Sequence, residues 1–462
     1  MTRPTDRNDT AFFGHPRALG FIVATEAGYA FAYYGMVTIL TLYMTHQLFQ
    51  PGHFQNIWGF GEYSRFMEGF FGKKTPLALA SLTFGLATSV GYGTPVVGGL
   101  IGDWVLGQRR TVLLGLSLLT AGFAALVTEQ GFLIALLLIV AGAGLVKSNL
   151  LGQIGRLYGP DDPRRTRAFG IYLIAVNVGG FLTPLVVGTL GEKVGWTQGL
   201  IAAAVGMALG LGAYLLGFRQ MPGDVIGARK TEEAATTPDE RRPGGALVVL
   251  ALVPVLIAST LIVGTYNQAF NIFPVWAEEH VNRNLFGFTA PVTWFSAMDG
   301  ILTIIGIAVA IRIWAWQERD GRPAREITRV MTGCALTAIG FSILGVSALI
   351  AGPAKVALFA PILFFVFVDS AIPWCDTVIQ SLITRVAPAG LTTTLLGAYF
   401  ITYFVGNFLV GWLGSLYESM SPAQFWGIHA ATAGTGVVLL AVAGPMLHAV
   451  LSARPKAAGA AA

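Results

Sequence analysis

Charged side chains are scarce in this chain. Of its 462 residues, 11% are Asp, Glu, Lys or Arg, whereas 54% are hydrophobic. A water-soluble globular domain carries about 25% charged residues, so the composition excludes a soluble protein, and the apolar content excludes a disordered one. Cysteine is also rare. Cys334 and Cys375 both lie in apolar runs, which excludes a disulfide scaffold.

The sequence also lacks the motifs of enzymes and of ATP-driven pumps. It contains no GxxxxGK[ST] phosphate loop, and its six histidines are scattered towards loops and the ends of apolar runs. We therefore predict no enzymatic activity, no cofactor and no metal site. The net charge of +5 does not indicate a nucleic-acid partner, because basic residues of a membrane chain collect in its cytoplasmic loops.

Long apolar runs are what the chain has in abundance. A membrane span needs about 20 mostly apolar residues, and twelve such runs are present, at 17–48, 78–104, 109–127, 132–158, 166–190, 197–217, 246–273, 290–316, 328–351, 355–385, 392–417 and 424–450. The first run exceeds the apolar part of a signal peptide, so we expect it to be retained. The fold class predicted is an all-α membrane protein with twelve transmembrane helices in the lipid bilayer.

The basic residues predict the orientation. If the runs cross the membrane alternately, most of the 29 Lys and Arg residues fall in the loops and tails on one side. Such an excess marks the cytoplasmic side, so both termini are expected to be cytoplasmic. Lys147 is the exception, since it lies in the middle of the fourth run.

A polar, Pro/Gly-containing segment at 219–244 divides the runs into two sets of six. The expected organisation is an N-terminal tail (1–16), a six-helix bundle (17–218), a cytoplasmic linker (219–244), a second six-helix bundle (245–450) and a C-terminal tail (451–462). Six plus six helices is typical of the major facilitator superfamily, whose two bundles rock about a central site.

The loop between the second and third runs carries a recognisable pattern. It reads GGLIGDWVLGQRR, with Gly99, Asp103, Gly107 and Arg109 at fixed spacing. The glycines allow helix ends to approach, and the aspartate and arginine can pair across the loop, so we expect a conformational latch here. The alternative is an ordinary charged turn.

When the ends of the runs are excluded, five charged residues lie inside them, namely Glu26, Lys147, Asp299, Asp369 and Asp376. A charge at the bilayer centre costs at least about 2.5 kcal/mol, so such residues face partners or water. Glu26 and Lys147 are the natural ion pair of the first bundle. That pair either opens and closes with substrate or proton, or is a static structural bridge.

Asp369 and Asp376 are seven residues apart, about two helical turns, with Pro373 between them. A shared face with a proline kink is typical of a gating helix. Two carboxylates without further oxygen ligands do not specify a metal ion.

Several segments together resemble one known family. The stretch from Gly98 to Arg110 is similar to that family's GGxxAD-x-x-LG block, and Val146 to Trp196 is similar to its fourth and fifth helices. Further matches are Lys147 and Asn149, Tyr172 and Asn177, the segment Thr293 to Asp299, the segment Thr384 to Pro388, and Gly406 with Asn407. The chain thus resembles the proton-dependent oligopeptide transporters of the major facilitator superfamily over nearly its whole length.

The departures from that family concern charge. Its ExxERFxYYG motif reads EAGYAFAYYG here, so Tyr29 replaces the second glutamate and Ala30 the arginine. Asn267 stands at an acidic position of the seventh helix, and Val368, next to Asp369, at a glutamate of the tenth. Proton coupling and peptide binding therefore depend on the charged residues that remain inside the spans.

The resemblance implies the site residues. For substrate we expect Tyr29, Tyr33, Tyr34, Tyr92, Lys147, Asn177, Asn267, Asp299 and Tyr399, and for proton coupling Glu26 with Lys147. The gating residues Asp369, Pro373 and Asp376 are predicted from their spacing alone. Asp299 replaces an asparagine that contacts the peptide amine, so it favours an amine-bearing substrate. The alternative is a span-end residue in an aqueous vestibule.

We therefore predict a monomeric secondary active transporter that moves di-/tripeptides or related small amphipathic metabolites with protons by alternating access. The compact loops favour a bacterial inner membrane. One alternative is a facilitator or exporter of another metabolite without proton coupling, and another is a transport-silent receptor or scaffold.

Overall fold

The computed structural model describes residues 9–159, 162–224, 226–227, 245–319, 326–387 and 392–451. Most of the expected linker 219–244 and nearly all of the expected tail 451–462 lie outside the described residues.

The predicted all-α membrane fold is confirmed. Eleven helices in the described part of the chain are long and apolar enough to cross a membrane. The remaining long helix, α1 (Arg17–Tyr43), has 27 residues and so a length of about 40 Å at 1.5 Å per residue. Polar side chains such as Thr25, Glu26 and Tyr29 lower its hydropathy, and all three are buried.

The fold comprises two compact units. Unit 1 combines the described residues of Met1–Glu232 with Gln268–Ile301 and Gly411–Glu418, and unit 2 contains those of Glu233–Asn267, Leu302–Val410 and Ser419–Ala462. Two short segments from the second half of the sequence thus pack with the first half.

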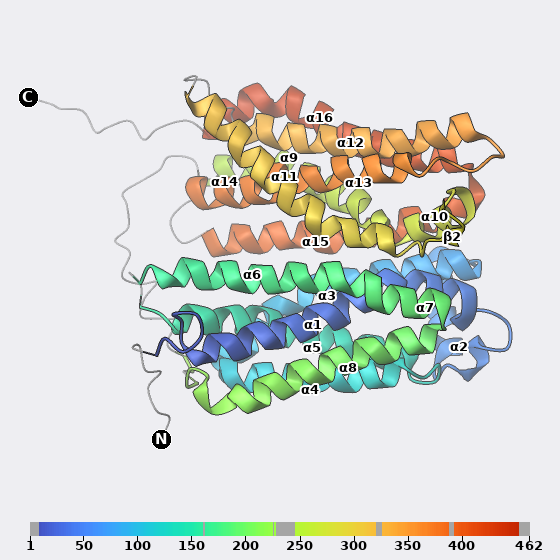
Figure 1. Ribbon diagram of the computed structural model, residues 1–462. Helices are drawn as coiled ribbons and strands as arrows, with labels where there is room; N and C mark the ends of the chain where they lie inside the picture. The colour runs from blue at the N-terminus through green and yellow to red at the C-terminus, as the bar shows by residue number, and fades with distance from the viewer. Residues whose placement is uncertain are drawn as a thin grey trace, which may run out of the picture. The chain divides into compact units, whose positions relative to one another are not determined.

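Six long helices form unit 1 (Figure 1): α1, α3 (Pro76–Trp104), α4 (Gln108–Leu126), α5 (Phe132–Arg156), α6 (Arg164–Thr183) and α8 (Trp196–Gly217). Glycines allow close approach between them. A Cβ on Gly98 of α3 would lie 2.0 Å from the carbonyl oxygen of Gly144 on α5, and one on Gly28 of α1 would lie 2.7 Å from that of Gly206 on α8. Helices α3 and α5, and helices α1 and α8, are therefore closely packed. Helix α1 also packs against α6.

Unit 2 is built from α9 (Gly245–Tyr266), α12 (Glu326–Ala351), α13 (Phe359–Ile372), α14 (Val378–Val386), most of α15 (Thr392–Gly414) and α16 (Pro422–Leu451). Within it α12 packs between α13 and α16 (Figure 1). Helix α11 (Trp294–Arg319) begins in unit 1 and continues in unit 2 after Ile301.

Short elements connect the long helices. They are the α-helices α2 (Phe60–Phe71), α7 (Thr189–Lys193) and α10 (Ile272–His280), the strands β1 (Asn284–Leu285) and β2 (Phe288–Thr289), π-helical turns at Met44–Leu48, Pro184–Gly188 and Pro373–Thr377, and 3-10 turns at Phe54–Asn56, Phe218–Gln220, Asn267–Ala269 and Tyr417–Ser419. The strands pair as an antiparallel hairpin, whose tip residues Phe286 (φ 52°) and Gly287 (φ 88°) both have the positive φ of a type I′ turn.

Candidate functional site

Glu26 is a buried carboxylate in the middle of α1, with 4% of its surface exposed. Tyr172 of α6 is its hydrogen-bond partner, while its Oε2 has no hydrogen-bond partner among the described residues. An ionised carboxylate in such a place is costly unless a positive charge acts on it.

Lys147 of α5 supplies that charge from a distance. It acts on Glu26 through its electric field, and its Nζ lies 5.2 Å from the ring centroid of Tyr92 on α3. No direct ion pair between Glu26 and Lys147 is formed in the described structure: the carboxylate hydrogen-bonds to Tyr172 through one oxygen, and the ammonium group lies over the Tyr92 ring.

Three tyrosines of α1 form an aromatic wall. The rings of Tyr29 and Tyr33 stack at 5.7 Å, and those of Tyr33 and Tyr34 meet edge to face at 6.0 Å. Beside them, a Cβ on Gly179 of α6 would lie 2.8 Å from the Cβ of Ala30. Helices α1 and α6 therefore touch at position 30, which leaves no room for the arginine of the resembled family.

A pocket in unit 1 brings three of the predicted residues together. Tyr34 of α1, Asn177 of α6 and Asp299 of α11 line it, and its cavity volume is about 40 Å³. The other lining residues are Thr38, Val176, Gly180, Pro184, Phe270, Ser296 and Gly300. This volume is well below the 300–1,000 Å³ usual for ligand pockets, so in this conformation the pocket admits one polar end group of a ligand and not a whole peptide.

Helix packing positions the polar groups of the pocket. A Cβ on Gly300 would lie 3.4 Å from the carbonyl oxygen of Asn177, so α6 and α11 approach each other there. Asn177 donates its side-chain N–H to Leu173 on its own helix at 2.8 Å. Asp299 is partly exposed, and its charge acts on Tyr34. The pocket thus combines one negative charge with a phenol, an amide and the hydroxyls of Thr38 and Ser296.

Other predicted residues lie in unit 2. Asn267 donates a hydrogen bond to Asn407 at 2.9 Å. Tyr399 is fully buried and donates to Asp376 at 2.6 Å, as does Tyr403 at 2.5 Å.

The two predicted gating carboxylates contact different helices. Asp369 accepts a hydrogen bond from Tyr266 of α9 at 3.4 Å, whereas the tyrosines that bind Asp376 belong to α15. Pro373 begins the π-helical turn Pro373–Thr377, which contains Asp376, whereas Asp369 lies in α13 before it. Gating by this helix stays a prediction.

The predicted latch is built differently from the expectation. No Asp103–Arg109 ion pair is formed in the described structure: Asp103 accepts a 3.4 Å hydrogen bond from Gln108, and the Arg109 guanidinium lies 3.7 Å above the Phe218 ring. Asp224 takes the acidic role, since its Oδ1 accepts the Arg109 backbone N–H at 2.8 Å.

Asp224 can reach the Arg109 backbone because residue 107 is a glycine and has no side chain in the way. A Cβ on Gly107 would lie 2.4 Å from the Asp224 side chain, and Gly107 has φ +81°. Gly99 is the other glycine of the motif. A Cβ on it would lie 3.5 Å from the Ser148 hydroxyl oxygen, which is an ordinary contact distance.

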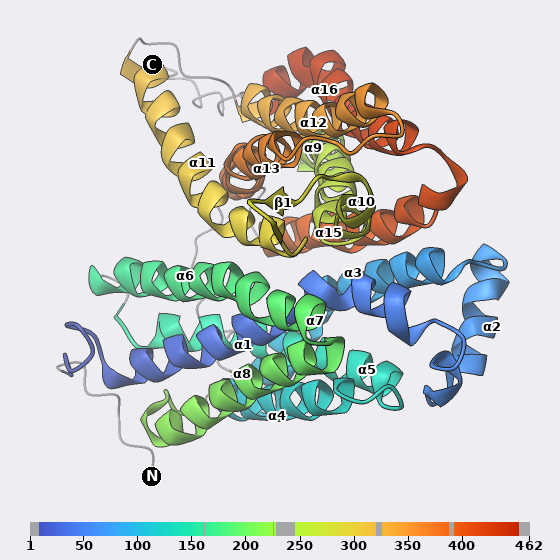
Figure 2. The same cartoon turned by 45° about the vertical axis from the view of Figure 1, so that its right-hand side comes forward.

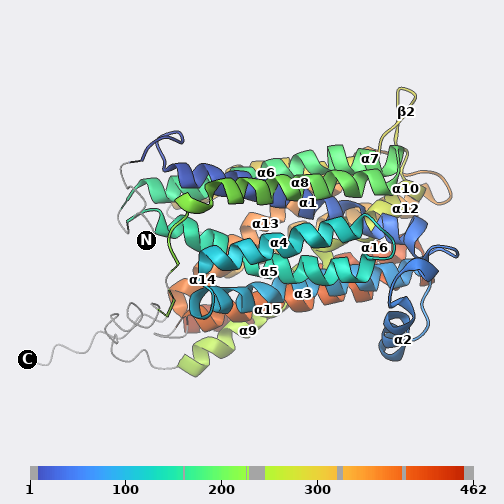
Figure 3. The same cartoon turned by 90° about the horizontal axis from the view of Figure 1, so that it is seen from below.

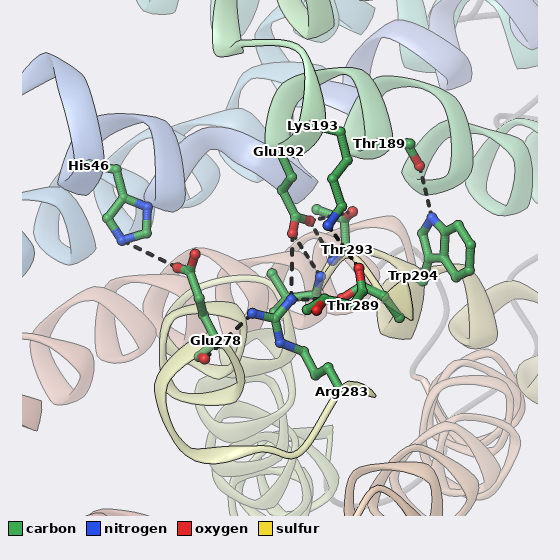
Figure 4. A network of polar contacts seen from close by, with 11 residues as sticks. His46, Thr189, Glu192, Lys193, Glu278, Arg283, Thr289, Thr293 and Trp294 are labelled. Carbon is green, nitrogen blue, oxygen red and sulfur yellow. Dashed lines mark hydrogen bonds and ion pairs between the residues drawn. The ribbon is translucent and has the colours of Figure 1, made fainter. Parts of the chain in front are cut away.

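The structure adds a polar cluster that the sequence did not reveal, which we call the Glu192 clamp (Figure 4). Glu192 of α7 accepts the backbone N–H groups of Val292 and Thr293, each at 2.9 Å, and the Thr293 hydroxyl at 2.7 Å. These groups lie at the beginning of α11, where a negative charge is stabilising. The Arg283 guanidinium forms an ion pair with Glu192, at 4.0 Å from Nη1 to Oε2.

Three neighbouring contacts extend the clamp. Lys193 donates to the Thr289 carbonyl at 2.8 Å, Trp294 donates to Thr189 at 2.8 Å, and His46 lies 3.3 Å from Glu278 (Figure 4). The clamp therefore joins α7 to the hairpin and to the beginning of α11.

Comparison with known proteins places this architecture. The model of the POT family matches residues 109–230 and 239–427. The chain is 25% identical to the uncharacterized transporter YclF of Bacillus subtilis (strain 168), over 90% of this chain and 91% of that protein. It is 24% identical to a di-/tripeptide transporter of Lactococcus lactis subsp. cremoris, over 96% and 98%.

Solved structures share the fold. A mutant of the peptide transporter POT in complex with alafosfalin has a TM-score of 0.81 and 23% identity, covering 96% of this chain and 97% of that one. A POT family transporter in complex with 5-aminolevulinic acid has a TM-score of 0.79 and 21% identity, covering 96% and 98%. Since the family model matches more than half of its residues, this chain belongs to the POT family.

Proposed function

We propose that the protein is a secondary active transporter that moves di-/tripeptides or related small amphipathic metabolites by alternating access. The observation that carries this proposal is the pocket lined by Tyr34, Asn177 and Asp299. Its carboxylate attracts an ammonium group at one end of a ligand.

The opposite end of a peptide-like substrate carries a carboxylate. Lys147 is an exposed positive group in the middle of the span helix α5, and its approach to a substrate carboxylate would weaken its electrostatic interaction with Glu26. Relatives support this chemistry, because the Lactococcus lactis protein is a di-/tripeptide transporter and 5-aminolevulinic acid, bound in one solved relative, carries both an amine and a carboxylate.

Proton coupling is assigned to Glu26. A buried carboxylate without a directly bound cation gains most from protonation when the field of Lys147 is withdrawn. Substrate binding at Lys147 and proton binding at Glu26 would then favour each other. This links transport to a proton gradient without the family glutamate that Tyr29 replaces.

A second candidate has support of its own. Ala30 packs against Gly179, so the first-helix arginine of the resembled family is absent and its place is filled. A facilitator or exporter that works without proton coupling is the function this observation favours.

Uptake into proteoliposomes separates the two. A labelled dipeptide is offered with and without an inward proton gradient, for the wild type and for Glu26→Gln. The proposal expects stimulation by the gradient in the wild type alone. Uptake without stimulation in the wild type would favour the facilitator, and no uptake of any dipeptide would overturn the peptide-like substrate.

Location and assembly follow the same reasoning. We place the protein in a bacterial inner membrane as a monomer with cytoplasmic termini, on the support of the basic residues on that side.

A further inference from the structure

Helix α2 (Phe60–Phe71) lies outside the set of spans, in the connection between α1 and α3. Gly59 (φ 79°) and Gly72 (φ 72°) flank it in the left-handed region, where the chain turns readily only at glycine. In Figures 2 and 3, α2 lies at the end of unit 1 where α3 begins and runs across the direction of the spans. A helix in this position lies at the level where a bilayer meets water.

Three sides of α2 can be distinguished. At about 100° per residue, Phe60, Tyr63, Met67 and Phe71 share one side, and these residues are buried or partly buried. That side packs on the protein: Met67 is 2% exposed, and the Tyr63 hydroxyl hydrogen-bonds to Thr83 of α3 at 2.6 Å.

The remaining two sides differ in chemistry. Phe66 and Phe70 form one flank, with 56% and 72% of their surfaces exposed and their rings 5.0 Å apart. The other flank is charged, with Glu62 and Arg65 paired at 3.1 Å and both about three-quarters exposed. Exposed phenylalanines beside a charged flank are typical of a helix that lies in a membrane interface.

The segment that follows α2 indicates that lipid covers the aromatic flank. Only residues 72–75 separate α2 from the first residue of the membrane span α3, so the flank is continuous with the lipid-facing surface of unit 1. Lys73 and Lys74 lie in this connection, and Lys73 is exposed. Lysine side chains near the end of a span extend their ammonium groups into the headgroup layer, where they can contact the phosphates of anionic lipids.

We propose that α2 is an interfacial helix whose Phe66 and Phe70 side chains insert between the headgroups of the adjacent bilayer leaflet, with Lys73 and Lys74 against anionic lipids. The arrangement holds the connection between α1 and α3 on the membrane surface. It does not depend on the transported substrate.

Spin labelling tests this directly, because both native cysteines are buried and an introduced cysteine is labelled selectively. Nitroxides are attached to Phe66→Cys and Phe70→Cys, with Glu62→Cys and Arg65→Cys on the charged flank as matched controls. The protein is placed in vesicles of phosphatidylethanolamine and phosphatidylglycerol. Accessibility to oxygen, which enters lipid, and to a nickel chelate, which stays in water, is then measured.

The proposal expects a ratio of oxygen to nickel accessibility at positions 66 and 70 several-fold above that at 62 and 65. It also expects this difference to fall when Lys73 and Lys74 are both replaced by Gln, or when phosphatidylglycerol is omitted. Equal ratios on the two flanks would overturn the proposal. Dipolar broadening between labels of two copies would do the same, since a second protein molecule would then cover the flank.

Discussion

The Glu192 carboxylate accepts three hydrogen bonds at the start of α11, and two of them come from Thr293, at 2.9 Å from its backbone N–H and 2.7 Å from its hydroxyl. Only 9% of the Glu192 side chain is exposed. All of these groups belong to unit 1, so the Glu192 clamp holds the beginning of α11 against α7 within that unit.

Glu192→Gln should weaken the clamp. The neutral amide keeps the shape but loses the charge and one acceptor oxygen, and hydrogen bonds to charged groups contribute about 1.5–3 kcal/mol. We expect a lower melting temperature and easier opening near Thr293. Glu278→Gln is the control, because that carboxylate is 38% exposed and pairs with His46, while the contact of Glu278 with Arg283 is through its backbone carbonyl and is kept in the variant. Equal melting temperatures for the two variants would contradict the assignment.

Gly188→Ala tests the close approach at the same place. A Cβ on Gly188 would lie 2.2 Å from the Thr293 hydroxyl oxygen, so the added methyl group must push α11 away, at a cost of about 1–3 kcal/mol. Gly170→Ala on α6 is the control, since nothing lies within 4 Å of its Cβ and alanine favours a helix by about 0.5–1 kcal/mol. Thermal unfolding should separate the two variants in opposite directions, and a harmless Gly188→Ala would show that the contact is not tight.

Glu129, in the loop between α4 and α5, predicts a pH dependence of stability. Burial raises its pKa, but hydrogen bonds from Asn56, Gln47 and His53, at 2.9, 2.8 and 2.6 Å, together lower it below the ordinary value. The stability it contributes is present above the unfolded pKa of about 4.3 and is lost as pH falls through the lower folded pKa.

Glu129→Gln should therefore cost about 1 kcal/mol at neutral pH and nothing at pH values where the wild-type carboxyl is protonated. The measurement is the melting temperature of both proteins across the acid range, with the exposed Glu68→Gln as control. A difference that stays constant with pH would argue against a role for the carboxylate charge.

Lys147→Ala should abolish transport while leaving expression and folding intact, because the variant removes the only charge that acts on Glu26 from α5. Proteoliposome uptake and a thermal-unfolding curve measure the two properties on one preparation. Uptake at the wild-type rate would remove Lys147 from the transport cycle. Loss of folding together with uptake would make it a structural bridge.

The helices and the intramembrane charges could be predicted from the sequence, since spans obey a rule of length and hydropathy and charges within them are few. The contacts of those charges could not. Glu192 stands at the end of a predicted span like any other acid, and its partners are backbone N–H groups 100 and 101 residues further along the chain, which leave no mark on the sequence.

In two places, opposite charges that the sequence suggested as partners have other neighbours in the structure. Asp103 and Arg109 are close along the chain, yet Arg109 stacks on Phe218 and its backbone N–H is taken by Asp224. Similarly, Glu26 and Lys147 have opposite charges, but Tyr172 and Tyr92 intervene as partners. Opposite charges in a helical bundle meet only where packing leaves no better neighbour.

The central claim is that Asp299 receives a substrate amine in the pocket it shares with Tyr34 and Asn177. The most direct measurement is uptake of a labelled dipeptide and of its N-acetylated form by wild-type protein, Asp299→Asn and the exposed control Glu279→Gln. We predict that the wild type and Glu279→Gln transport only the free-amine peptide, and that Asp299→Asn transports it at least about tenfold less well, as expected for the loss of about 1.4 kcal/mol. Equal uptake of the free and acetylated peptides by the wild type, with Asp299→Asn unaffected, would contradict the claim.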